Sequence, residues 1–286
     1  MASALENVSD TARWVAMYRA IESERSDARF RDPWARRLAG ARGAEIARNL
    51  PGFRSGLWPM VARTCAFDEI LLRAIARDGA DTVVDLAAGL DTRPWRMPLP
   101  ERLRWFDVDL PGILGYKVGA LRDERPACTY EAVSADLTRP SERRDVLARI
   151  GALAGRALVL TEGLLVYLSD GEVGDLAEDL RAVPTLRWWL LDLITPRLKT
   201  MLEKRWGSSL GAARAPFRFA PAESTRFFEK FGWREVEWRS TLEEAIRVGR
   251  APWNAWIWRL LGRFASPEKR AELHRLGGFA LLERAG

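Results

Sequence analysis

Apolar residues recur at helical spacing through residues 1–80, and no stretch of that segment has the alternation or the short apolar runs of a strand. We predict three helices there. The first is capped by Asp10, the second begins at Asp32-Pro33, and the third covers residues 58–77. Residues 1–80 are therefore predicted to form an N-terminal helical cap.

After residue 80, short apolar runs alternate with helical patterns. The predicted strands are residues 82–86, 103–108, 129–135, 157–161, 187–194, 233–239 and 279–284. The predicted helices are residues 112–122, 141–153, 171–182, 221–231, 242–248 and 254–264. Strands that alternate with helices are typical of a parallel sheet with helices on both faces. We predict a doubly wound, mostly parallel, seven-stranded α/β sheet over residues 81–286, with helical insertions near 196–220 and 250–276.

The composition narrows the class of protein. Two cysteines, Cys65 and Cys128, and one histidine, His274, argue against a disulfide framework or a metal centre. The net charge of +6 arises from 45 basic and 39 acidic residues that are spread along the chain, whereas nucleic-acid binders usually cluster their basic residues. Neither a signal-peptide pattern nor a membrane-spanning apolar run is found. We expect a soluble, cytoplasmic protein that binds a small molecule, with no nucleic-acid, membrane or metal partner; no particular oligomeric state is predicted.

The most informative stretch is VVDLAAGLDTR, residues 83–93, in which a buried strand ends at Asp85 and a loop of small residues follows. In open α/β sheets, ligands bind beyond the carboxyl ends of the strands, and small residues let them approach the backbone. The next strand ends in two acids, Asp107 and Asp109, which lie 18 and 20 residues after Gly89. An acid at that distance is suited to bind ribose hydroxyls, although either could instead cap the following helix.

Five segments in order resemble the leucine carboxyl methyltransferase family, which includes protein phosphatase carboxyl methyltransferases and bacterial relatives that act on polyketides and other secondary metabolites. The segments are MVARTCAFDE (60–69), VVDLAAGLDTR (83–93), FDVDLP (106–111) with Lys117 following, ADL (135–137) and TEGLLVYLS (161–169). Weaker similarity extends through FFEKFGW (227–233). Two residues depart from the family pattern: Ala87 stands where glycine is usual, and Asp107 where glutamate is usual.

The resemblance implies a Rossmann-like fold and an S-adenosylmethionine (SAM)-dependent O-methyltransferase. The residues that it assigns to the cofactor are Arg63, Asp85, Gly89, Asp109, Asp136, Leu137 and Glu162. Arg63 is expected to pair with the SAM carboxylate, because a guanidinium binds a carboxylate through two parallel hydrogen bonds. Asp85 and Gly89 are expected near the amino-acid portion of SAM, and Asp109 at its ribose.

Further assignments concern the adenine and the transferred methyl group. Asp136 is expected to accept a hydrogen bond from the adenine amino group, with Leu137 packing nearby, although a plain helix cap fits this aspartate equally well. Glu162 follows the fourth predicted strand and is expected to bind the SAM ammonium group or to face the methyl group. Glu162 and Tyr167 are the candidates for positioning the reaction.

Substrate selection is expected to fall to the helical cap and the insertions. The candidate wall residues are Trp14, Tyr18, Trp253 and Trp256. Aromatic residues at helical spacing are more often part of a core, so the wall assignment competes with a structural one. We favour methylation of a carboxylate on an aromatic or polyketide-like small molecule, because a carboxylate is ionised at neutral pH and needs no base. His274, in a charged segment, is predicted to lie on a solvated face.

Three alternatives stay open. Methylation of a hydroxyl would require a general base or an acidic hydroxyl. A nicotinamide-dependent oxidoreductase would share the strand, the small-residue loop and the ribose acid, but the GxGxxG pattern is absent. A SAM-binding protein without catalytic activity would be consistent with the loss of glycine at Ala87.

Overall fold

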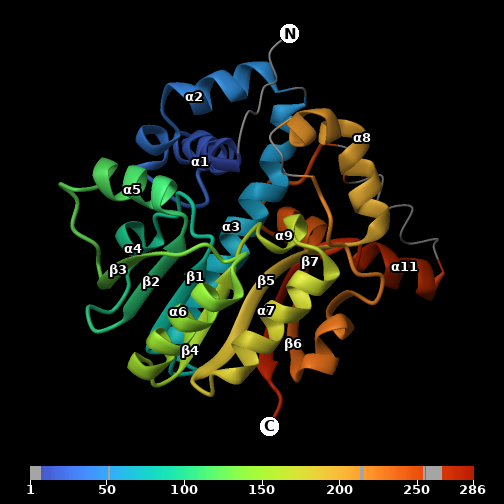
Figure 1. The fold of residues 1–286 in the computed structure, drawn as a ribbon. Coiled ribbons are helices and arrows are strands. Elements are labelled where there is room, and N and C mark those ends of the chain that lie inside the picture. The colour runs from blue at the N-terminus through green and yellow to red at the C-terminus, as the bar shows by residue number, and fades with distance from the viewer. Residues whose placement is uncertain (1–7, 51, 213–215, 254, 256–265) are drawn as a thin grey trace.

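The computed structural model describes residues 8–50, 52–212, 216–253, 255 and 266–286. Within them, seven strands form one sheet in the order β3-β2-β1-β4-β5-β7-β6 (Figure 1). The strands are β1 Thr82–Leu86, β2 Arg104–Asp109, β3 Thr129–Ser134, β4 Ala157–Thr161, β5 Leu186–Ile194, β6 Trp233–Ser240 and β7 Gly277–Arg284. β1 to β5 pair in parallel, and β7 runs antiparallel to both β5 and β6. The predicted seven-stranded, mostly parallel sheet is confirmed.

The helices surround this sheet. They are α1 Val8–Ser23, α2 Ala35–Asn49, α3 Phe53–Ala76, α4 Arg93–Arg96, α5 Pro111–Ala120, α6 Pro140–Leu153, α7 Asp170–Ala182, α8 Pro196–Ala212, α9 Thr241–Arg247 and α11 Pro267–His274, with 3₁₀ turns η1 Leu165–Tyr167 and η2 Ser224–Phe231. Capping residues explain where several of these helices begin or end. Ser169 and Glu172 form a capping box at the start of α7, and Gly232, with φ +78°, ends η2 in the left-handed conformation.

Some predicted helices differ from the observed ones. Asp10 lies inside α1 instead of capping it, and its carboxylate pairs with the Arg42 guanidinium at 2.7 Å. The predicted helix 221–231 is a 3₁₀ turn over its second part. The predicted helix 254–264 lies outside the described residues except for Ala255.

Two apolar layers sandwich the sheet, since successive strand residues point to opposite faces. On one face, Val84 and Trp189 pack with α6, α7 and η2. On the other face, Val83 and Trp188 pack with α3 and α9. Every residue of β1 is buried, as expected for a central parallel strand.

The chain passes from β1 to β2 and β3 on one side, then returns to β4 on the other side of β1. This reversal leaves a crevice at the carboxyl ends of β1 and β4, where ligands bind in doubly wound sheets. α1 and α2 lie above this end of the sheet, and α8 lies beside them (Figure 1). A separate apolar cluster joins α1, α2 and Trp206 of α8. The C-terminal part of α3 packs on the sheet. The predicted boundary between a helical cap, residues 1–80, and the sheet domain therefore stays a prediction.

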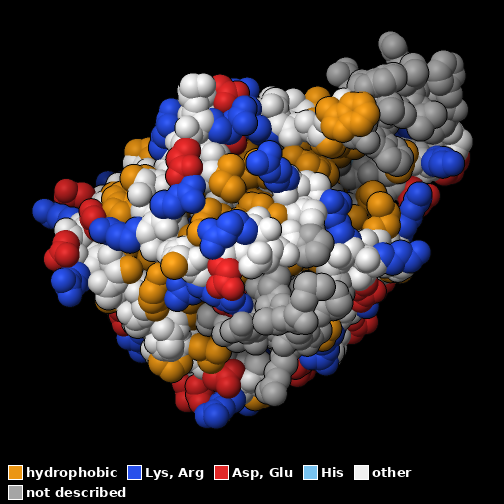
Figure 2. Space-filling model, turned by 90° about the horizontal axis from the view of Figure 1, so that it is seen from above, with side chains coloured by type: hydrophobic (Ala, Val, Ile, Leu, Met, Phe, Trp, Pro, Cys, Tyr) orange, Lys and Arg blue, Asp and Glu red, His pale blue; other side chains and the backbone are white. Residues whose placement is uncertain are grey.

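The surface carries mixed charge. Seen from the side of the cap, Lys and Arg side chains are spread among acidic and apolar ones (Figure 2). Across the described residues, no helix combines the length and the apolar character needed to cross a bilayer. In the same part of the chain, no group of three or more His, Cys, Asp or Glu side chains is placed to hold a metal ion.

Candidate active site

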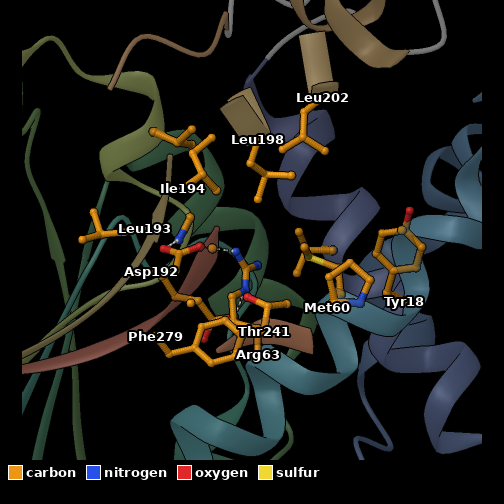
Figure 3. A pocket seen from close by; sticks show the side chains of 18 of the residues that line it. Tyr18, Met60, Arg63, Asp192, Leu193, Ile194, Leu198, Leu202, Thr241 and Phe279 are labelled. Atoms are coloured by element: carbon orange, nitrogen blue, oxygen red, sulfur yellow. Dashed lines mark hydrogen bonds and ion pairs between the residues drawn. The ribbon is translucent and has the colours of Figure 1, made fainter. Parts of the chain in front are cut away.

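A cavity of about 900 Å³ opens at the carboxyl ends of β1, β4 and β5, and is enclosed by α1, α3 and α8. Figure 3 shows Arg63, Asp192 and Thr241 close together at one part of its wall. Apolar side chains of Met60, Ile194, Leu198 and Leu202 surround the neighbouring space. The cavity therefore has a charged floor and apolar walls, as small-molecule sites commonly do.

The structure brings most of the predicted site residues to this one cavity. Those that line it are Trp14, Tyr18, Arg63, Asp85, Gly89, Asp109, Glu162 and Tyr167. Asp136 and Leu137 are not among the lining residues, and the Asp136 carboxylate accepts hydrogen bonds from the backbone and hydroxyl of Thr138. Trp253 is also not among them and is 85% exposed, while Trp256 lies outside the described residues.

Arg63 is a buried charge at the floor of the cavity. Its Nη1 donates a hydrogen bond to Oδ2 of Asp192 at 2.9 Å, and its Nε lies 3.1 Å from Oε1 of Glu162. The other Glu162 oxygen lies 2.8 Å from Nη2 of Arg93. Burial by itself would lower the pKa of Arg63, but the two carboxylates outweigh it and the pKa is raised. Arg63 therefore stays charged and able to bind an anion.

Two carboxylates of different character lie at the carboxyl ends of β1 and β2. Asp85 is buried, and among the described residues its Oδ2 has no hydrogen-bond partner. Burial, followed by the nearby charges of Asp91 and Asp107, raises the pKa of Asp85 well above its usual value. Asp109 instead accepts hydrogen bonds from the backbone N–H groups of Gly89 and Leu110, both at 2.7 Å. Asp109 therefore holds the loop in place while facing the cavity.

The two acids of β2 have separate roles. Asp107 is fully buried, and its carboxylate lies 2.6 Å from Nζ of Lys117. It also accepts hydrogen bonds from the Tyr130 hydroxyl at 2.6 Å and from the Trp105 indole at 2.9 Å. Asp107 is not among the lining residues, whereas Asp109 is. Of the two acids, Asp109 is thus the one that lines the cavity.

Ala87 has a left-handed backbone, with φ +58°. This conformation costs an L-residue roughly 1–2 kcal/mol because its Cβ crowds the following carbonyl. Glycine lacks that Cβ, which accounts for the glycine usual at this position in the family that the sequence resembles. The departure at Ala87 therefore stores local strain in a loop that lines the cavity.

Replacing Ala87 with glycine is expected to raise the free energy of unfolding by roughly 0.5–1 kcal/mol, because relief of strain exceeds the added chain entropy of glycine. Affinity for SAM, the cofactor that the resemblance implies, should stay equal or improve. Urea unfolding and calorimetry measure the two effects. Ala88, which lies outside the left-handed region, provides the matched control, and Ala88→Gly should lower stability. A clear loss of SAM affinity at intact stability would show that the alanine is an adaptation of this site.

Two features of the wall were not predicted. Asp192 is a charged residue near the end of the apolar run WWLLDLI, the same signal that Asp85 gives in β1. His274 lines the cavity, whereas only a position on a solvated face was predicted for it. Its side chain is 41% exposed, and its Nδ1 lies 3.0 Å from Oε1 of Glu243. His274 is thus exposed to solvent, as predicted, and it also forms part of the cavity wall.

Comparison with known proteins agrees with this architecture. Two solved structures share the fold at low sequence identity. A duf574 family protein from Streptomyces avermitilis has a TM-score of 0.59 at 15% identity, covering 96% of this chain and 97% of that one. An O-methyltransferase family protein from Burkholderia thailandensis has a TM-score of 0.51 at 13% identity, covering 97% of this chain and 70% of that one.

Proteins related by sequence have higher identity to this chain than these two structures do. A Streptomyces coelicolor protein named "Putative S-adenosyl-L-methionine-dependent methyltransferase" is 38% identical over 177 residues, which span 57% of this chain and 60% of that protein. A Frankia alni protein with the same descriptive name is 32% identical over 259 residues, or 84% and 88% of the two chains. The model of the family described as leucine carboxyl methyltransferase matches residues 12–181. The chain belongs to the leucine carboxyl methyltransferase family.

Proposed function

We propose that this protein is a SAM-dependent O-methyltransferase that acts on a small, largely apolar molecule, with a carboxylate as the favoured acceptor. The proposal rests chiefly on one observation. Arg63, Asp85, Gly89, Asp109 and Glu162 come from separate segments of the chain and line one cavity at the reversal of strand order. The names of its relatives and of its family support the same activity.

The residues of the cavity fit SAM chemically. Arg63 offers a charged donor for a carboxylate, and Asp109 offers carboxylate oxygens at the end of β2 for a ribose. The unpartnered Oδ2 of buried Asp85 is an acceptor that a polar ligand group can satisfy. We propose that Asp136 and Leu137, which lie apart from the described lining, approach the adenine at the edge of the site.

Bound SAM supplies an activated methyl group on a sulfonium sulfur. The task of the protein is to align an acceptor oxygen with that group and to exclude water, which can contribute several kcal/mol. Glu162, held between Arg63 and Arg93, is positioned to orient the donor. Tyr167 lines the same cavity, and its burial raises the pKa of its hydroxyl to about 12. We propose that neutral Tyr167 donates a hydrogen bond that orients the acceptor.

The walls support an aromatic or polyketide-like acceptor. The rings of Trp14 and Trp206 lie edge to face with their centroids 5.3 Å apart, and both residues line the cavity. The Tyr18 hydroxyl donates to the backbone carbonyl of Phe53 at 2.7 Å, so its polar end is already satisfied. Aromatic rings placed in this way favour an apolar ligand body. We propose that residues 1–80 act as the cap that selects the substrate.

The purified chain is expected to bind SAM and S-adenosylhomocysteine in isothermal calorimetry, and to transfer a labelled methyl group to members of a panel of carboxylic acids and phenols. NADH is the control ligand, because an oxidoreductase would bind it instead. Absence of binding by either sulfur compound at millimolar concentration would contradict the proposal. Cofactor binding without turnover of any acceptor would favour a non-catalytic SAM-binding protein.

Loss of His274 is expected to leave methyl transfer nearly unchanged. The His274–Glu243 pair is solvent-exposed, and a carboxylate acceptor is already ionised, so no base is required. The rate of His274→Ala, measured with a carboxylic acid that the panel shows to be methylated, should be flat from about pH 6 to 8. A fall of about 100-fold or more, the usual scale for loss of a general base, would point to a hydroxyl acceptor.

A further inference from the structure

Asp192 lies near the carboxyl end of β5, beyond residues 12–181 that the family model matches. Its side chain is 23% exposed and lines the cavity. Figure 3 shows its carboxylate directed toward Arg63, with the hydrogen bond between them drawn. A charged side chain among the apolar residues of a strand is costly unless its partners compensate it.

The two oxygens of Asp192 hold two different parts of the site. Oδ2 accepts the hydrogen bond from Nη1 of Arg63 at 2.9 Å, and Oδ1 accepts one from the backbone N–H of Gly163 at 2.8 Å. Gly163 directly follows Glu162, so the same carboxylate fixes the turn that carries Glu162. One side chain thereby joins α3, the end of β4 and β5.

The packing around this junction leaves little freedom. Gly163 has φ +70°, and a Cβ at this position would lie 3.0 Å from Nη1 of Arg63. The turn therefore needs glycine for both its backbone and its close approach to the guanidinium. Nε of Arg63 lies 3.1 Å from Oε1 of Glu162 but makes no hydrogen bond among the described residues, whereas Nη1 donates one to Asp192. The orientation of Arg63 is thus set before any ligand arrives.

We propose that Asp192 is a positioning residue for the cofactor, acting through Arg63 and through the Glu162–Gly163 turn. This inference rests on the proposed function, in which Arg63 binds the SAM carboxylate. Preorganisation of a binding group saves the entropy of ordering it when the ligand binds. Without Asp192, Arg63 can turn toward Glu162 and present another edge, so SAM affinity falls although the fold persists.

The test measures the Kd of SAM by calorimetry for the full chain and for Asp192→Asn, which is nearly isosteric but uncharged. We expect about tenfold weaker binding, within the usual coupling range for residues in contact. Asp179→Asn is the matched control. Asp179 pairs with buried Arg143 at 2.6 Å, is 13% exposed and is not among the lining residues. This control should lose stability without a change in Kd.

A double-mutant cycle separates positioning from general destabilisation. In the Arg63→Ala background, Asp192→Asn should have little further effect on Kd, because its route to the cofactor is gone. Asp192→Glu, which keeps the charge, should bind SAM more tightly than Asp192→Asn but less tightly than the unchanged chain. If the asparagine variant does not fold, the Kd of Asp192→Glu serves as the test. Unchanged Kd in a folded Asp192 variant, or equal losses in both backgrounds, would overturn the inference. Failure of the unchanged chain to bind SAM would instead overturn the proposed function.

Discussion

Replacing Arg63 with alanine is expected to weaken SAM binding by roughly one to two orders of magnitude, which corresponds to ~1.5–3 kcal/mol for a charge-assisted pair. The guanidinium is buried, and its partners Glu162 and Asp192 keep its pKa raised, so it is a fixed cation at the cavity floor. The chain should remain folded but less stable. In this variant Glu162 keeps its ion pair with Arg93. Asp192 lies at the cavity wall, where water can solvate its carboxylate.

Calorimetry with SAM and urea unfolding measure affinity and stability separately. Lysine should restore little affinity, because an ammonium lacks the planar fork that binds a carboxylate through two hydrogen bonds. Arg143→Ala is a suitable control, since Arg143 is also buried and paired but is not among the lining residues. If folded Arg63→Ala binds SAM like the unchanged chain, Arg63 has only a structural role.

Replacing Lys117 with methionine is expected to lower the free energy of unfolding by about 3–5 kcal/mol. The Lys117 and Asp107 side chains are both fully inaccessible to solvent, and their charged atoms lie 2.6 Å apart. Methionine leaves the Asp107 carboxylate buried without its counter-charge. Tyr130 and Trp105 still donate to it, but two neutral donors do not replace an ammonium group.

The free energy of unfolding is measured in urea for Lys117→Met and for the double variant Asp107→Asn/Lys117→Met. The double variant should recover much of the loss, because removing both charges of a buried pair often costs little. Cofactor affinity should change less than stability, since neither residue is among those lining the cavity. A single variant as stable as the unchanged chain would show that water or another group compensates Asp107.

The sequence by itself determined the strands and the edge of the sheet where the site lies. Each of the seven strands was predicted to within two residues of its observed ends, because β-branched and apolar runs between turn residues are local signals. The acids Asp85, Asp109 and Glu162 follow from the same logic. Each lies at or just after the end of a parallel strand, so knowing the strands also places the acids together.

Only the tertiary structure decided which side chains meet. Arg63 and Asp192 are 129 residues apart, and their contact depends on how α3 crosses the sheet, which is set by many weak apolar contacts. The same packing buries Asp107 against Lys117 and turns Asp109 to the cavity, although the two acids have nearly the same spacing from Gly89. It also leaves Trp253 exposed while Trp14 lines the wall, because residue type alone does not fix the direction in which a side chain faces.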